Sequence, residues 1–162
     1  MSGAIDRFTE AARVQGLHPE VRRFPEGTKT ATDAATAIGC DVGQIVKSLV
    51  FMAESPASTA SPILALTSGS NRADVSVLAT LMGADVVRRA TPEEARAATG
   101  FAVGGTPPFG HPERVRAFLD RDLFAFDEVW AAAGTPDSVF PLTPADLLRV
   151  SGASVAEFAD RG

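Results

Sequence analysis

The order of apolar and polar positions predicts a chain of short helices and strands in mixed succession. Ile5, Phe8 and Ala12 recur at helical spacing and predict an amphipathic N-terminal helix within residues 1–17, ended by Gly16. Further helices are predicted over residues 30–39, 75–82, 92–98 and 144–150. Each follows a residue whose side chain can accept a hydrogen bond from the first turn: Thr30 or Thr32, Asp74, Thr91 and Thr143.

The longest apolar run covers residues 42–53 and is interrupted only by Lys47 and Ser48, which predicts a central strand covered on both faces. Residues 54–62 are rich in Ser, Ala, Thr and Pro, and are interpreted as the loop of a hairpin whose second strand is 63–67. Other extended segments are predicted at 19–25, 85–89, 115–119, 123–126, 129–133 and 139–142, with a turn at 155–158.

Several of these strands follow one another without a crossover helix, which implies antiparallel pairs and a mixed sheet. The 162 residues are 45% hydrophobic and 22% charged, which suits one globular domain with its own core. We therefore expect a single α/β (α+β) domain over residues 1–162. No secretory signal is visible and no apolar run approaches the roughly 20 residues of a membrane span. A cytoplasmic protein without a membrane partner is the expectation.

Composition limits the chemistry. Cys40 is the only cysteine, which excludes an intrachain disulfide and a cysteine-built metal site, and we interpret it as a small, half-buried apolar residue. His18 and His111 both lie beside prolines in expected loops, so neither a zinc site nor a histidine-based triad is expected. No phosphate loop, nucleotide-binding glycine motif or nucleophile elbow is present. We expect no metal and no cofactor.

The charge pattern restricts the partners. A net charge of −5 argues against broad coating of nucleic acid, but leaves open a local basic face that holds one RNA end. Thirteen of the basic residues are arginine, and only Lys29 and Lys47 are lysine. Lys47 lies in the apolar run, where an ammonium group is costly unless it reaches water, an anion or a ligand. It either extends to solvent from the start of the strand or lies at the mouth of a pocket.

A second candidate feature is the glycine- and proline-rich stretch Phe101-Ala-Val-Gly-Gly-Thr-Pro-Pro-Phe-Gly110. Glycines allow a close approach of backbone to ligand, and prolines stiffen a turn and lack N–H donors. The remaining N–H groups could be held around a small pocket, although a purely structural turn is the alternative. Together with Lys47, such a loop could polarise a carbonyl or hold an anion without a protein nucleophile.

These two stretches resemble the YbaK/prolyl-tRNA-editing domain family. The similarity lies in residues 44–51 and 99–111, with supporting matches at 30–35, 68–74 and 129–134, and it extends from about residue 20 to the end of the chain. The resemblance implies one α/β domain with a twisted, mixed, partly barrel-like sheet flanked by helices. It also implies a freestanding aminoacyl-tRNA deacylase, a hydrolase that removes a wrongly attached amino acid from the acceptor end of a tRNA. An aminoacyl-tRNA synthetase is a further expected partner.

The same resemblance implies site residues. Lys47 matches the family's functional lysine near the tRNA 3′ end, and residues 104–108 match the loop that lies against the aminoacyl carbonyl. Catalytic roles are implied for Lys47, Gly104, Gly105, Thr106 and Pro108. Substrate contacts are implied for Phe24, Thr30, Ser48, Ser68, Gly69, Arg72, Pro107, Phe109, Gly110 and His111. Water would attack the activated ester, with the loop N–H groups stabilising the oxyanion and a ribose hydroxyl of the substrate orienting the water.

Two departures leave the amino-acid specificity open. Val139 occupies the place of a functional aspartate of cysteinyl-tRNA deacylases, with Asp137 two residues earlier, and Phe24 matches a pocket tyrosine. A non-catalytic module that binds a tRNA end, a nucleotide or a small acyl ligand is the alternative function. A further expectation is a basic face for the acceptor stem, with these candidates: Arg22, Arg23, Arg72, Arg88 and Arg89.

Overall fold

The computed structural model describes residues 3–25, 28 and 30–161, and in this part of the chain the predicted helices are all found. They are α1 (Ala4–Val14), α2 (Ala31–Ile38), α3 (Val75–Met82), α4 (Pro92–Thr99) and α5 (Pro144–Ser151). The side chains of Thr30, Asp74, Thr91 and Thr143 accept hydrogen bonds from the first turns of α2 to α5, as predicted.

Eight strands in the described part of the chain form one mixed sheet. They are β1 (Arg22–Arg23), β2 (Ile45–Ser55), β3 (Ser58–Ser68), β4 (Val86–Arg89), β5 (Arg116–Asp120), β6 (Val129–Ala132), β7 (Ser138–Leu142) and β8 (Ser154–Ala156). The strand order is β1-β7-β6-β2-β3-β5-β8, and β4 also pairs with β2. The β2–β3, β2–β4, β6–β7 and β1–β7 pairs are antiparallel, whereas β2–β6, β3–β5 and β5–β8 are parallel. The mixed α/β fold is confirmed, but β1 and β8 do not pair, so the sheet is not closed into a barrel.

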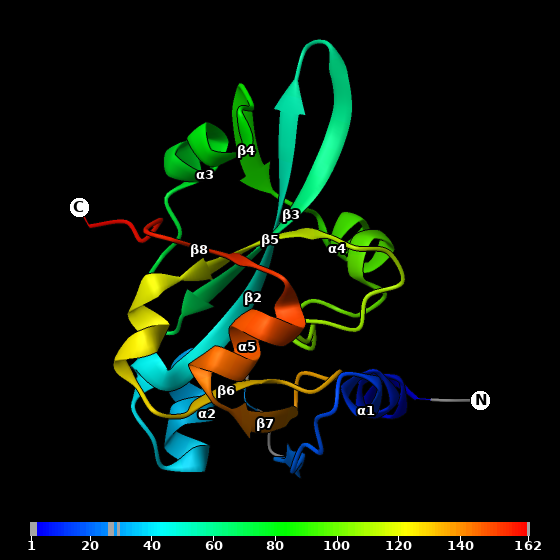
Figure 1. Cartoon of the computed structure of the whole chain (residues 1–162), viewed down its shortest axis with the longest axis vertical. Helices are drawn as coiled ribbons and strands as arrows, with labels where there is room; N and C mark the ends of the chain where they lie inside the picture. Colours follow the sequence, from blue (N-terminus) through cyan, green and yellow to red (C-terminus); the bar gives the residue numbers. More distant parts are fainter. Residues whose placement is uncertain (1–2, 26–27, 29, 162) are drawn as a thin grey trace.

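Three local predictions were wrong. Residues 54–62 are not a loop, because β2 and β3 continue to Ser55 and from Ser58 and leave a tight turn at the tip (Figure 1). Residues 123–126 lie in and beside a 3-10 helix over Arg121–Ala125, because the carboxylate of Asp120 accepts the N–H of Asp122 and bends the chain out of β5. Near the C-terminus, β8 forms a short strand beside β5 where a turn was predicted.

The core lies on both faces of β2, as its apolar run predicted. One face packs Val46 and Val50 with residues of α1, α4 and α5, among them Phe8, Ala95 and Leu147. The other face packs Phe51 and Ala53 against Leu78 of α3 and Phe158. A smaller cluster joins α2 to the start of β2 and to β6 and β7, through Ala34, Ala35, Ile45, Trp130 and Val139. Strand β2 is therefore the element on which all three clusters meet.

Candidate active site

Strand β2 has two different neighbours along one of its edges. At its start, Ile45 and Val46 pair with Trp130 and Ala131 of β6. Further along, Phe51 to Glu54 pair with β4. Between these two pairings, residues 47–50 are paired as a ladder only with β3 on the opposite edge among the described residues. The sheet is therefore split beside the middle of β2.

Hydrogen bonds on either side of the split fix which backbone groups face it. The carbonyl of Ile45 accepts the N–H of Gly69, next to β3, whereas the carbonyl of Val50 accepts the N–H of Ala90, next to β4. Backbone groups of successive strand residues point to opposite edges. The N–H and C=O of Ser48 therefore face the split. The Oγ atom of Ser48 is also buried, with no hydrogen-bond partner in the described part of the chain.

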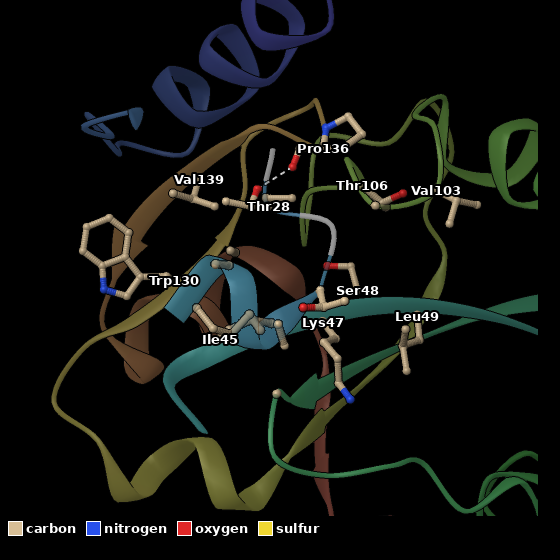
Figure 2. A pocket seen from close by; sticks show the side chains of 18 of the residues that line it. Thr28, Ile45, Lys47, Ser48, Leu49, Val103, Thr106, Trp130, Pro136 and Val139 are labelled. Atoms are coloured by element: carbon tan, nitrogen blue, oxygen red, sulfur yellow. Dashed lines mark hydrogen bonds between the residues drawn. The ribbon is translucent and has the colours of Figure 1, made fainter. Parts of the chain in front are cut away.

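A cavity of about 510 Å³ lies at this split. Its walls come from α2, the middle of β2, the end of β4, the loop after α4, and β6 and β7 (Figure 2). The cavity thus joins the two stretches that the sequence singled out, since Lys47 and Ser48 lie on one wall and Val103, Gly104 and Thr106 on another.

The half of the glycine- and proline-rich loop that lines the cavity is rigidly built. Gly104 has φ of +86°, a conformation that favours glycine. Gly105 packs so closely on Thr135 that an added Cβ would lie 2.7 Å from that residue's Cα. Its N–H donates to the carbonyl of Ala102 at 3.0 Å, and the hydroxyl of Thr106 donates to the same carbonyl. Among the described residues the N–H groups of Gly104 and Thr106 have no backbone acceptor, so both are candidate donors to a ligand.

Helix α1 supports this loop from outside, a role that the sequence did not reveal. The guanidinium of Arg7 lies 4.6 Å from the centre of the Phe101 ring and donates to the carbonyl of Gly100 at 2.9 Å. The Phe8 ring packs against Phe109, 5.4 Å between ring centres. The backbone of α1 also approaches Gly134 so closely that a Cβ there would lie 2.7 Å from the oxygen of Ala4. Both loops beside the cavity therefore rest on α1.

Lys47 lines the cavity with its stem, but its ammonium group turns away from the loop. Nζ donates to the carbonyl oxygen of Asn71 at 2.5 Å, and Figure 2 shows it pointing away from Val103 and Thr106. Partial burial, followed by the positive charge of Arg89, lowers the pKa of Lys47, while the carboxylate of Asp120 acts in the opposite direction. Lys47 and Arg89 lie on the same face of the sheet, because Arg89 pairs with Phe51, four residues from Lys47. The other lysine, Lys29, lies outside the described residues.

The second half of the loop lies elsewhere. Pro108, Phe109, Gly110 and His111 line a separate hollow of about 400 Å³ between this loop and α5. Pro107 is buried, and its carbonyl accepts a hydrogen bond from Nε2 of His111 at 2.8 Å. Burial lowers the pKa of His111, whose ring also meets Phe101 edge-on. The structure therefore brings Gly104 and Thr106 to the cavity that Lys47 lines. Residues 108–111 lie outside that cavity.

The remaining predicted contact residues divide in the same way. Thr30 and Gly69 line the cavity, and at Gly69 an added Cβ would lie 2.3 Å from the oxygen of Val42. Ser68 is buried, and its hydroxyl donates to the carbonyl of Gly43. Phe24 packs half-buried against the cluster of α2, β6 and β7. Arg72 is exposed and close enough to Lys47 to lower its pKa further.

One end of the cavity is apolar. Ala34, Ile45, Trp130 and Val139 line it, and each of these residues is less than one tenth exposed. Val139 brings no carboxylate to this end, and Asp137 does not supply one in its place. The oxygens of Asp137 accept hydrogen bonds from the side chains of Thr135 and Arg23. This end can therefore accept an uncharged group.

Over residues 3–25, 28 and 30–161, no three His, Cys, Asp or Glu side chains lie together as a metal site would need. Within the same residues, no helix has the length and apolar character to span a membrane. The cavity's polar atoms come from backbone, hydroxyl, ammonium and guanidinium groups, which suit a carbonyl or an anion.

Comparison with known proteins identifies the family. Residues 25–150 match the model of the aminoacyl-tRNA editing domain, and the chain belongs to this family. The chain is 31% identical over 136 residues to the uncharacterised protein YwhH of Bacillus subtilis, covering 84% of this chain and 83% of YwhH. It is 29% identical over 140 residues to the proline–tRNA ligase of Streptococcus thermophilus strain CNRZ 1066, covering 86% of this chain but only 22% of that ligase.

Solved structures agree with this assignment. A protein described provisionally as a trans-editing enzyme for prolyl-tRNA synthetase superposes with a TM-score of 0.88 at 45% identity, covering 99% of both chains. The resemblance inferred from residues 44–51 and 99–111 is therefore confirmed at the level of the family.

The sequence also left one feature of the site hidden. Residues 47–50 read as an ordinary buried strand, and only the pairing with two separate strands, β6 and β4, shows that they border an opening. The pair of polar residues at 47 and 48 within an apolar run was the one local sign of it.

Proposed function

We propose that this protein is a trans-editing hydrolase that deacylates a mischarged aminoacyl-tRNA in the cytoplasm. Membership of the editing family supports the reaction class. The observation that carries the proposal is the cavity at the split of the sheet, which is lined by backbone groups and a buried hydroxyl and has cations nearby. An aminoacyl ester is already activated, so a positioned water can cleave it directly.

The loop supplies the stabilisation of the transition state in this proposal. The N–H groups of Gly104 and Thr106 would hold the oxyanion that forms on the ester carbonyl, an effect of about 3 kcal/mol for each well-placed donor. Gly105 contributes packing instead, because its N–H is already bound to Ala102. Pro107 and Pro108 have no N–H and hold the loop in shape. The terminal ribose hydroxyl of the substrate would orient the water.

The cations beside the cavity would hold the phosphate of the terminal nucleotide. Lys47, Arg72 and Arg89 form this group, since the charges of Arg89 and Arg72 both lower the pKa of Lys47. Two other candidates are already engaged: Arg88 is ion-paired with Glu54 and Glu94, and Arg23 with Asp137. Arg22 stacks over Trp130, 4.9 Å from the centre of its ring, and is not part of the cavity lining.

The apolar end would receive the side chain of the amino acid. Its walls, Ala34, Ile45, Trp130 and Val139, offer no charge to a charged side chain, so the edited amino acid is uncharged. The similarity to parts of proline–tRNA ligases and to a trans-editing enzyme supports prolyl-tRNA as the tRNA, with its synthetase as a partner that supplies the mischarged product.

A panel of charged tRNAs tests the proposal. Purified protein would be incubated with tRNAs that carry Cys, Ala, Ser, Thr or Pro, and release of the amino acid would be followed. We expect release from at least one tRNA that carries an uncharged, non-cognate amino acid. Binding of the tRNA end without any release across the panel would establish the non-catalytic binding module instead.

A further inference from the structure

Ser48 is the one described residue of β2 whose backbone donor and acceptor both face the split without a strand partner. On one side of it, Val46 is paired with Ala131 of β6. On the other side, the carbonyl of Val50 accepts the N–H of Ala90. The split therefore leaves the N–H and C=O of one residue, Ser48, without strand partners. This residue lies in the wall of the cavity that Gly104 and Thr106 also line.

The chemistry of this gap matches an α-amino acid. In an antiparallel pair, two opposed residues exchange both of their N–H to O=C bonds. An aminoacyl ester carries the same two groups at the same separation, an α-ammonium donor and a carbonyl acceptor. We infer that the aminoacyl group pairs with Ser48 as a single residue of an antiparallel strand would, with its ammonium on the carbonyl of Ser48 and its ester carbonyl on the N–H of Ser48. This inference rests on the proposed function and names how its substrate is recognised.

The direction of pairing sets the surroundings of each end of the substrate. In the antiparallel orientation, the amino side of the ligand points along β2 toward Val50, where Ala90 already occupies the edge. The ester side points toward Lys47 and the end of β6, whereas Arg89 lies toward the amino side, because it pairs with Phe51. A substituent on the amino group would therefore collide with the chain at Ala90.

This arrangement gives selectivity that does not depend on the amino-acid side chain. It accepts an aminoacyl-tRNA with a free amino group and rejects N-acylated forms, which include peptidyl-tRNA and formylated aminoacyl-tRNA. It also assigns the N–H of Ser48 as a donor to the oxyanion beside those of Gly104 and Thr106. The unpartnered Oγ of Ser48 lies on the same residue and adds a further polar contact within the cavity.

The substrate side of the inference is tested with the full chain and one tRNA that it deacylates. N-acetylation of that aminoacyl-tRNA should lower kcat/KM by about 100-fold or more, because the ammonium contact is lost and the acyl group meets Ala90. Equal rates for the free and N-acetylated substrates would overturn the inference while leaving the hydrolase in place.

The protein side is tested at Ser48. Ser48→Pro removes an N–H that faces the split and leaves the ladder with β3 intact, a position at which proline is tolerated in a sheet. Ser48→Ala, which removes only the hydroxyl, is the matched variant. We expect kcat/KM of Ser48→Pro to lie about 100-fold below that of Ser48→Ala, as for loss of one oxyanion donor. Equal kcat/KM values of the two folded variants would overturn the inference.

If the Ser48→Pro variant does not fold, a binding measurement on the wild-type protein tests the same contact. Wild-type protein labelled with ¹⁵N would be titrated with 3′-aminoacylamino-3′-deoxyadenosine, which carries an amide in place of the ester. We expect the Ser48 amide proton to move downfield and to exchange more slowly with solvent. Binding that leaves the Ser48 amide unchanged would overturn the inference. Wild-type protein that deacylates no charged tRNA, yet shows the Ser48 shift, would overturn the proposed hydrolase and retain the pairing.

Discussion

Strand β2 contains two kinds of region that differ in how many of their edges are paired. At Ile45–Val46 and again at Phe51–Glu54, β2 is paired on both edges and belongs to the core. Over residues 47–50 the same strand is paired as a ladder on one edge only and lines a cavity. The difference shows how a site can be made without a special motif in the strand itself: two neighbours stop short of each other, and the backbone between them stays available.

The close packing at the paired start of β2 can be tested by a substitution at Gly69. Its N–H bonds to Ile45, and an added Cβ would lie 2.3 Å from the oxygen of Val42. Gly69→Ala should therefore lower the free energy of unfolding by about 3 kcal/mol, measured by urea denaturation. Gly3→Ala is the control, since no described residue lies within 4 Å of a Cβ there. Equal stability of the two variants would contradict the close packing at this end of the strand.

The open segment can be tested at Lys47 with activity as the readout. Lys47→Ala removes a cation beside the cavity, and kcat/KM should fall about 10- to 100-fold, as for loss of a hydrogen bond to a charged group. Arg96→Ala, which removes an exposed cation of α4 outside the cavity lining, is the control. Thermal unfolding should show that both variants are folded. An unchanged rate in Lys47→Ala would remove Lys47 from the site.

The role of the cation group beside the open segment can be tested through the salt dependence of tRNA binding. If Arg72 and Arg89 contact phosphate, each substitution by alanine should reduce the slope of log K against log salt concentration for tRNA binding by about one. Titrations over a range of KCl would measure this. The engaged residue Arg88 serves as the comparison, because its guanidinium is held by Glu54 and Glu94. A binding constant that does not depend on salt would contradict the acceptor-stem face.

The smallest expected effect is a change in the pKa of Lys47. The charge of Arg89 lowers this pKa, so Arg89→Ala should raise it toward the ordinary lysine value. Arg72→Ala should raise it by less, because its contribution is the smaller of the two. The pKa can be followed by NMR titration of the ¹³Cε signal of Lys47. A pKa that falls in Arg89→Ala would show that the two cations are not neighbours.

Local chemistry explains what the sequence could predict. The capping side chains of Thr30, Asp74, Thr91 and Thr143 and the glycines after the helices act within a few residues, so helix bounds were accessible. The 3-10 helix that includes residues 123–125 could not be predicted in the same way. The apolar residues of this segment fit a strand equally well, and the bend depends on one carboxylate, that of Asp120. The exposed, polar parts of β2 and β3 also lacked the apolar signal of a strand.

The site was predictable only in part, for a related reason. The sequence suggested that Lys47 and the glycine-rich loop act together, and the cavity is lined by Lys47, Gly104 and Thr106. It could not show that Nζ of Lys47 turns to Asn71, that the second half of the loop lines another hollow, or that α1 supports the first half. These features depend on contacts between segments far apart in the chain.

A crystal structure with 3′-aminoacylamino-3′-deoxyadenosine bound would test the central claim most directly, namely that the split beside residues 47–50 is where the aminoacyl end binds. We predict that the aminoacyl group lies between Ala90 and the end of β6, with both of its backbone groups on Ser48 and its adenosine toward Lys47. Density for the ligand in the hollow lined by Phe109, His111 and α5, with the split left empty, would contradict it.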